Sequence, residues 1–131
     1  MIEPGKSRKF CVVGLGRLGS AYLNFPPPEL AGFELTAGFD TNVTRTEMLK
    51  SPAPLYPTYK MGEVIGRFGI EIALLCVPAG EAQATAERLA AAGIRGILNF
   101  APVPVTVPPG IAVRNIRLTE ELRSLSIMMD D

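Results

Sequence analysis

A glycine-rich turn directly after an apolar run constrains this sequence more than any other feature. The turn is Gly14–Gly19, of sequence GLGRLG, and it follows the run Phe10–Val13. A continuous apolar run is typical of a strand buried on both faces of a parallel sheet. Glycines at this spacing permit a tight turn, a close approach of backbone to a ligand, and close packing of the following helix on the strand. The sequence therefore predicts a β-α-β unit over residues 10–40 with a phosphate-binding turn.

An acidic residue stands where such a unit needs one. Asp40 is the last residue of the second expected strand, Phe33–Asp40, 21 positions after Gly19. Its carboxylate would accept hydrogen bonds from the hydroxyls of an adenosine ribose and would repel a 2′-phosphate. We therefore expect Gly14, Gly16 and Gly19 to hold the pyrophosphate of NAD(H), with Asp40 on the ribose. The structural alternative, in which the glycines only shape a turn and Asp40 only ends a strand, stays open.

The two residues between the second and third glycines are included in the predicted cofactor site. Arg17 and Leu18 begin an expected helix over 17–25, which Pro26–Pro28 would end because proline cannot continue a helix. Arg17 either reaches a phosphate or is a solvated helix residue, and the sequence does not separate these interpretations.

Strands and helices alternate along the rest of the chain. We expect further strands at 54–56, 70–77, 96–100 and 111–116, and helices at 42–49 (capped by Thr41 or Asn42), 60–68, 80–92 (stopped by Gly93) and 119–129 (capped by Thr119). This pattern predicts a Rossmann-like, doubly wound parallel α/β sheet in the order 3-2-1-4-5-6. Residues 10–131 would form one such domain, preceded by an extension over 1–9.

Two more strand ends point to the same edge of the expected sheet. Val77 and Pro78 follow the strand beside the first one, and Asn99, Phe100 and Ala101 follow the next strand. Ligands bind at this edge in doubly wound sheets. We therefore expect these residues on the nicotinamide side of the site. The structural alternatives are an ordinary β-α turn, a turn asparagine with its own partners, and a core aromatic.

Composition removes several classes of function. The 13 basic and 13 acidic residues balance, so no basic face for nucleic acid is indicated. There is no histidine, which removes the commonest general base and metal ligand, and no metal-ligand spacing appears. Cys11 and Cys76 lie in apolar runs and are expected to be buried, with a redox pair as the alternative. No signal peptide and no apolar run near the roughly 20 residues of a membrane helix occurs, so we expect a cytoplasmic protein.

Several of these segments together resemble a known family. The segments are GLGRLG at 14–19, GFD at 38–40, LCVP at 75–78, GILNFAPV at 96–103 and NIRLTEEL at 115–122. They are similar to the Rex family, bacterial repressors that sense the NADH/NAD⁺ ratio. The resemblance implies an NAD(H)-binding domain that dimerises through a swapped C-terminal helix, here Thr119–Met129. The family's winged helix would not fit into the nine residues before the first strand, so we expect no direct DNA binding by this chain.

The sequence departs from the family at two places. The family usually has asparagine where this chain has Arg17, and aromatic residues where its last helix ends in Ile127, Met128 and Met129. The second departure bears on closure over the nicotinamide. The apolar stripe of that helix, Leu118, Leu122, Leu125 and Met129, could pack on its own sheet or on a partner subunit.

Two other functions remain as alternatives. One is a binder of coenzyme A or another adenine nucleotide, because the Rex domain falls within a broader grouping of coenzyme A-binding domains. The other is the cofactor domain of an oxidoreductase, since such enzymes open with a similar glycine loop. Catalysis would need a substrate domain and a proton donor, and we therefore expect no enzymatic activity.

Overall fold

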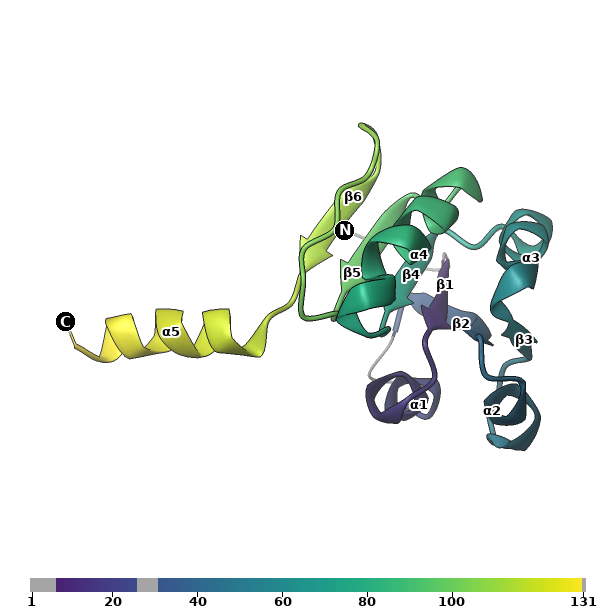
Figure 1. Ribbon diagram of the computed structural model, residues 1–131, viewed down its shortest axis with the longest axis horizontal. Helices are drawn as coiled ribbons and strands as arrows, with labels where there is room; N and C mark the ends of the chain where they lie inside the picture. Colours follow the sequence, from purple (N-terminus) through teal and green to yellow (C-terminus); the bar gives the residue numbers. More distant parts are fainter. Residues whose placement is uncertain (1–6, 26–30, 131) are drawn as a thin grey trace.

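Six parallel strands form one sheet in the order β3-β2-β1-β4-β5-β6, which confirms the predicted order (Figure 1). The computed structural model describes residues 7–25 and 31–130. The strands are β1 (Arg8–Val13), β2 (Phe33–Asp40), β3 (Leu55–Pro57), β4 (Ile72–Leu75), β5 (Gly96–Asn99) and β6 (Ala112–Asn115).

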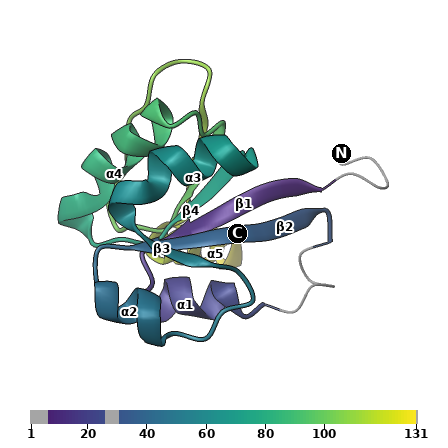
Figure 2. The same ribbon diagram turned by 90° about the vertical axis from the view of Figure 1, so that its right-hand side faces the viewer.

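Helices cover the sheet on both faces. They are α1 (Arg17–Leu23), α2 (Val43–Met48), α3 (Met61–Phe68, preceded by the short helix η2, Thr58–Lys60) and α4 (Ala79–Ala91). A further helix, α5 (Leu118–Met129), follows β6. Figure 2 shows α1 and α2 on one face and α3 and α4 on the other. This is the doubly wound arrangement expected from the alternation of strands and helices.

The alternation of side chains along β1 divides the core into two layers. Cys11 and Val13 pack with the α3 and α4 side, whereas Phe10 and Val12 pack with Leu23 of α1. These four side chains, in the second part of β1, are all buried. A strand enclosed on both faces must be apolar throughout, which explains the continuous run in the sequence.

The register of the strands brings three strand ends together. Val13 lies opposite Phe39 on β2 and Leu75 on β4. Just beyond, the Gly14 N–H donates to the Phe39 carbonyl at 2.8 Å, and the Cys76 N–H donates to the Val13 carbonyl at 2.7 Å. The turns that follow β1, β2 and β4 therefore open at one edge of the sheet.

Several element boundaries differ from those predicted. β1 begins at Arg8, two residues earlier than expected, and β4 ends at Leu75, two residues earlier. The predicted cap Thr119 is wrong, because α5 begins at Leu118 and no side chain caps it. Asn42 is confirmed as the cap of α2, since its side chain accepts from the Arg45 N–H at 3.2 Å. The predicted stop at Pro26–Pro28 lies outside the described residues.

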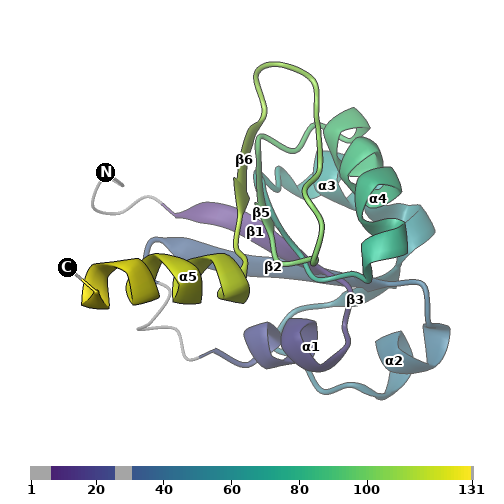
Figure 3. The ribbon, with the colours of Figure 1, turned by 60° about the vertical axis from the view of Figure 1, so that its left-hand side comes forward.

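The last helix extends away from the sheet (Figures 1 and 3). Its apolar stripe is exposed: Leu118 is 74% accessible, Leu122 56%, Leu125 52% and Met129 75%. An exposed apolar stripe of this length is typical of a helix that packs on another surface. Within residues 7–25 and 31–130, no helix is long and apolar enough to cross a membrane.

Candidate functional site

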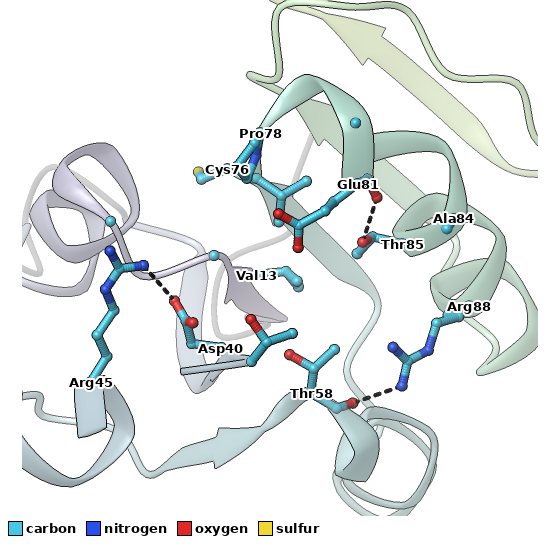
Figure 4. Close-up of a pocket in the computed structure, with 15 residues that line it drawn as sticks. Val13, Asp40, Arg45, Thr58, Cys76, Pro78, Glu81, Ala84, Thr85 and Arg88 are labelled. Atoms are coloured by element: carbon cyan, nitrogen blue, oxygen red, sulfur yellow. Dashed lines mark hydrogen bonds and ion pairs between the residues drawn. The ribbon is translucent and has the colours of Figure 1, made fainter. Parts of the chain in front are cut away.

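A cavity of about 580 Å³ opens where β1, β2 and β4 end (Figure 4). The glycine loop, the β2–α2 turn and α4 form its walls. Its lining residues are Val13, Gly14, Gly16, Asp40, Thr41, Arg45, Thr58, Cys76, Val77, Pro78, Gly80, Glu81, Ala84, Thr85 and Arg88. Of the sequence-predicted site residues, five lie here: Gly14, Gly16, Asp40, Val77 and Pro78.

The three glycines of the loop have different reasons to be glycine. Gly14 has φ +93°, and a Cβ there would lie 2.4 Å from the Cys76 carbonyl oxygen. A Cβ on Gly19 would lie 1.7 Å from the Gly14 carbonyl oxygen, so α1 could not pack so close to β1 with any side chain there. Gly16 is different, because a Cβ on it would have no atom within 4 Å. The fold needs Gly14 and Gly19, whereas Gly16 leaves open space at the cavity.

Asp40 connects the glycine loop to the turn after β2. Its side chain is 5% exposed; one carboxylate oxygen accepts from the Leu15 N–H at 2.7 Å and the other from the Asn42 N–H at 2.7 Å. Arg45 approaches the first oxygen at 3.4 Å and is half exposed. A carboxylate has about four acceptor positions, so Asp40 keeps acceptor capacity toward the cavity.

The α4 wall contains residues that the sequence reasoning missed. Glu81, Ala84, Thr85 and Arg88 are spaced three and four apart, and all line the cavity. Such spacing places them on one face of the helix. Arg88 also donates to the Thr58 carbonyl oxygen at 3.3 Å and so bridges α4 to the turn after β3 (Figure 4). A polar stripe on an otherwise alanine-rich helix was the signal that could have revealed this wall.

The remaining predicted site residues lie outside the cavity. Arg17 and Leu18 are exposed, and neither is among the described residues that line the cavity. Asn99 is fully buried, and its amide is used within the chain: it donates to the Val103 carbonyl and to the Asn115 side chain and accepts from the Ala101 N–H, at 2.8–2.9 Å. These bonds support the interpretation of Asn99 as a turn residue. The ligand contacts of these residues, and of Phe100 and Ala101, stay predictions.

Phe100 lines a second, apolar groove. Its ring lies 5.1 Å from that of Tyr22, measured between centroids. The groove, about 340 Å³, is lined by Phe10, Tyr22, Phe33, Ile72, Leu74, Leu98 and Phe100. The lining comes from β1, β2, β4, β5 and α1. Every residue that lines this groove is apolar or aromatic.

The two cysteines are free thiols and differ in exposure. Cys11 is fully buried as expected, but Cys76 follows the end of β4, is only half-buried and lines the cavity. Burial raises the pKa of each thiol to about 12. Because the thiolate is the reactive form of cysteine, this burial disfavours the reactive state of both thiols. Within the described residues, no group of three potential ligands could hold a metal ion.

Curated relatives match most of this chain. The redox-sensing transcriptional repressor Rex of Leuconostoc citreum is 40% identical over 120 residues, which cover 92% of this chain and 56% of that protein. The Rex protein of Limosilactobacillus reuteri is 41% identical over 114 residues, 87% of this chain and 53% of that protein. The chain thus spans just over half the length of these relatives. The predicted resemblance to Rex is confirmed.

Solved structures agree with these relatives. A Rex-family repressor, RSP, in complex with NADH matches with a TM-score of 0.84 and 32% identity over 95% of this chain and 60% of that one. UDP-D-quinovosamine 4-dehydrogenase from Vibrio fischeri matches with a TM-score of 0.64 at 16% identity, which shows the shared fold alone. The family model described as the CoA binding domain matches residues 5–103. The chain therefore belongs to the CoA binding domain family.

Proposed function

We propose that this chain is an NAD(H)-binding, redox-sensing domain of the Rex type. The observation that carries the proposal is the cavity in which Gly14 and Gly16 lie beside Asp40, with the Leu15 N–H bonded to the Asp40 carboxylate at 2.7 Å. That bond fixes the glycine loop relative to the acidic residue. A dinucleotide's pyrophosphate on the loop then places an adenosine ribose at Asp40. The match to a repressor solved with NADH supports the same ligand.

Coenzyme A is the second candidate, because the family model is named for it. The ribose of coenzyme A carries a 3′-phosphate, and the adenosine ribose of NADP(H) carries a 2′-phosphate. Either phosphate would lie beside the Asp40 carboxylate and be repelled by its negative charge. Arg45 offsets part of that charge but lies 3.4 Å from the carboxylate and is half exposed, so screening by water weakens its contribution. A ribose with two free hydroxyls is the better match to Asp40.

We propose that the chain binds its ligand without chemistry. The sequence contains no histidine, and the curated relatives are repressors rather than enzymes. In this interpretation the dimer has two arrangements, and each ligand, NADH or NAD⁺, favours the arrangement that it binds more tightly. The size of the shift follows from the difference in a ligand's affinity for the two arrangements. DNA recognition would belong to another part of such a repressor, which would act in the bacterial cytoplasm.

Replacing Gly16 with alanine tests the proposed site. The new methyl group has open space within the fold but occupies the surface that the pyrophosphate would approach. We expect NADH affinity to fall at least about tenfold, with the melting temperature nearly unchanged. The measurement is calorimetric titration of both proteins with NADH.

Gly66→Ala is the matched control, because Gly66 is exposed on α3 and a Cβ there also has no atom within 4 Å. It should leave NADH affinity unchanged. Equal NADH affinity in Gly16→Ala and the unsubstituted chain would argue against phosphate binding at the loop.

We further propose a homodimer formed through α5. The exposed stripe at Leu122 and Leu125 supports this, as does the apolar groove beside Tyr22 and Phe100, which an apolar helix could cover. Met128 and Met129 at the end of α5 have adaptable side chains. They could cover a neighbouring surface in the role that the aromatic residues at this place have in the Rex family.

Sedimentation velocity tests the dimer. The unsubstituted chain should be dimeric at micromolar concentration, and the double substitution Leu122→Glu with Leu125→Glu should make it monomeric, because burying two carboxylates in an apolar contact is unfavourable. Ser124→Glu, on the other side of the helix, should remain dimeric. A monomeric unsubstituted chain would contradict the proposal.

A further inference from the structure

The pyrophosphate and ribose contacts proposed above do not involve the face of α4 that lines the cavity. With the phosphates on the glycine loop and the ribose at Asp40, the base attached to that ribose must occupy the rest of the cavity. Thr41 and Arg45 line the cavity beside Asp40, and the polar lining farther from Asp40 is Thr58 together with Glu81, Thr85 and Arg88 on α4. Figure 4 shows Glu81 and Arg88 projecting from α4 on either side of Thr85.

The middle of this face is formed by small side chains. Ala84 and Thr85 are small, and Thr85 is 8% exposed. The Thr85 hydroxyl donates to the Glu81 carbonyl oxygen at 2.7 Å, so its single hydrogen is used within the helix. Thr85 can therefore offer a methyl group and a lone pair to a ligand but no hydrogen bond donor. A planar ring could lie against these two residues.

The charged residues at the two ends of this face have complementary chemistry. Glu81 offers acceptors only, and Arg88 offers donors only. They are seven positions apart, which is roughly 10 Å along a helix, and both side chains are long enough to reach inward. Arg88 is held by the Thr58 carbonyl at 3.3 Å and keeps other N–H groups free. The two ends of this face therefore carry one acceptor group and one donor group.

Adenine matches that pair. Its exocyclic N6 amine is a donor, and the neighbouring N7 is an acceptor. We propose that the α4 face reads the adenine base, with Glu81 accepting from N6 and Arg88 donating to N7, while Ala84 and Thr85 support the ring. This assignment rests on the proposed function and identifies which residues select the base of the nucleotide.

Glu81 and Arg88 also suit the electrostatics of a helix, because an acid in the first turn and a base in the last turn are favourable without any ligand. The test must therefore measure the selectivity of the chain for the base of the ligand rather than the stability of the protein. A suitable probe is reduced nicotinamide hypoxanthine dinucleotide, which differs from NADH in the base alone. Hypoxanthine has an oxygen in place of the N6 amine and retains N7.

Calorimetric titration of the full chain with NADH and the hypoxanthine analogue separates the outcomes. The unsubstituted chain should bind NADH at least about tenfold more tightly than the analogue, because the analogue's oxygen faces the Glu81 carboxylate. In Glu81→Gln this ratio should fall to about one or reverse, since the glutamine amide can donate to that oxygen. In Arg88→Gln both ligands should weaken by a similar factor. Glu87→Gln, at an exposed site that bonds Gln83, should change neither.

The failures are distinguishable. If NADH binds and its ratio to the analogue is the same in the unsubstituted chain and in Glu81→Gln, the adenine assignment is wrong while the proposed function stands. If the unsubstituted chain shows no binding of NADH, the proposed function fails and the assignment fails with it.

Discussion

Replacing Gly19 with alanine is expected to lower the free energy of unfolding by about 3 kcal/mol or more. An added Cβ would lie 1.7 Å from the Gly14 carbonyl oxygen and 3.3 Å from a methyl group of Val12. The first contact is with backbone, which cannot rotate away as a flexible side chain could. Relief would require α1 to move off β1, and that movement would open the buried layer around Val12 and Leu23.

Urea unfolding of Gly19→Ala beside Gly66→Ala measures this effect. The two substitutions are chemically identical, and each glycine lies within a helix. Gly66→Ala should stabilise the chain by about 0.5–1 kcal/mol, because alanine loses less backbone entropy in a helix. Unchanged stability in Gly19→Ala would show that α1 does not pack on β1 as described.

Replacing Asn99 with alanine is expected to cost about 3 kcal/mol as well. The substitution removes three hydrogen bonds at a fully buried position and leaves the Ala101 N–H and the Val103 carbonyl without their partner. Each buried polar group left unpaired costs about 1–3 kcal/mol. The turn after β5 and the proline-rich segment that follows it would lose their anchor.

Asn115→Ala is the matched control for Asn99→Ala. Asn115 is exposed and shares only the one bond with Asn99 at 2.9 Å, so its loss should cost less than about 1 kcal/mol. Thermal unfolding of both variants in the absence of ligand gives the comparison. Equal stability of the two variants would mean that Asn99 is not the structural residue inferred from its bonds, and would return it to the candidate ligand contacts.

The sequence was informative where local chemistry and topology agree. The glycine spacing, the apolar run before it and Asp40 at the end of β2 each follow from the geometry of one β-α-β unit. The strand order followed from the alternation of strands and helices. The sequence therefore predicts that residues at the ends of β1, β2 and β4 lie together at one edge of the sheet.

Other parts of the site depend on contacts that spacing does not encode. Asn99 lies at the correct edge of the sheet, but its amide is used by Val103, Ala101 and Asn115, and no sequence pattern reveals that competition. In the sequence, Glu81 and Arg88 are ordinary charged residues near the ends of a helix. Only the fold shows that they line the cavity. The apolar run continues beyond the hydrogen-bonded part of β4, so the sequence alone predicts Cys76 within the strand.

The central claim is that this chain binds NAD(H) at the cavity beside Asp40, and one calorimetric titration tests it most directly. NADH, NADPH and coenzyme A are titrated separately into the same preparation of the chain. We expect NADH to bind with a dissociation constant at least about tenfold lower than those of NADPH and coenzyme A, because a ribose phosphate would meet the Asp40 carboxylate. Tighter binding of coenzyme A, or no binding of NADH, would contradict the claim.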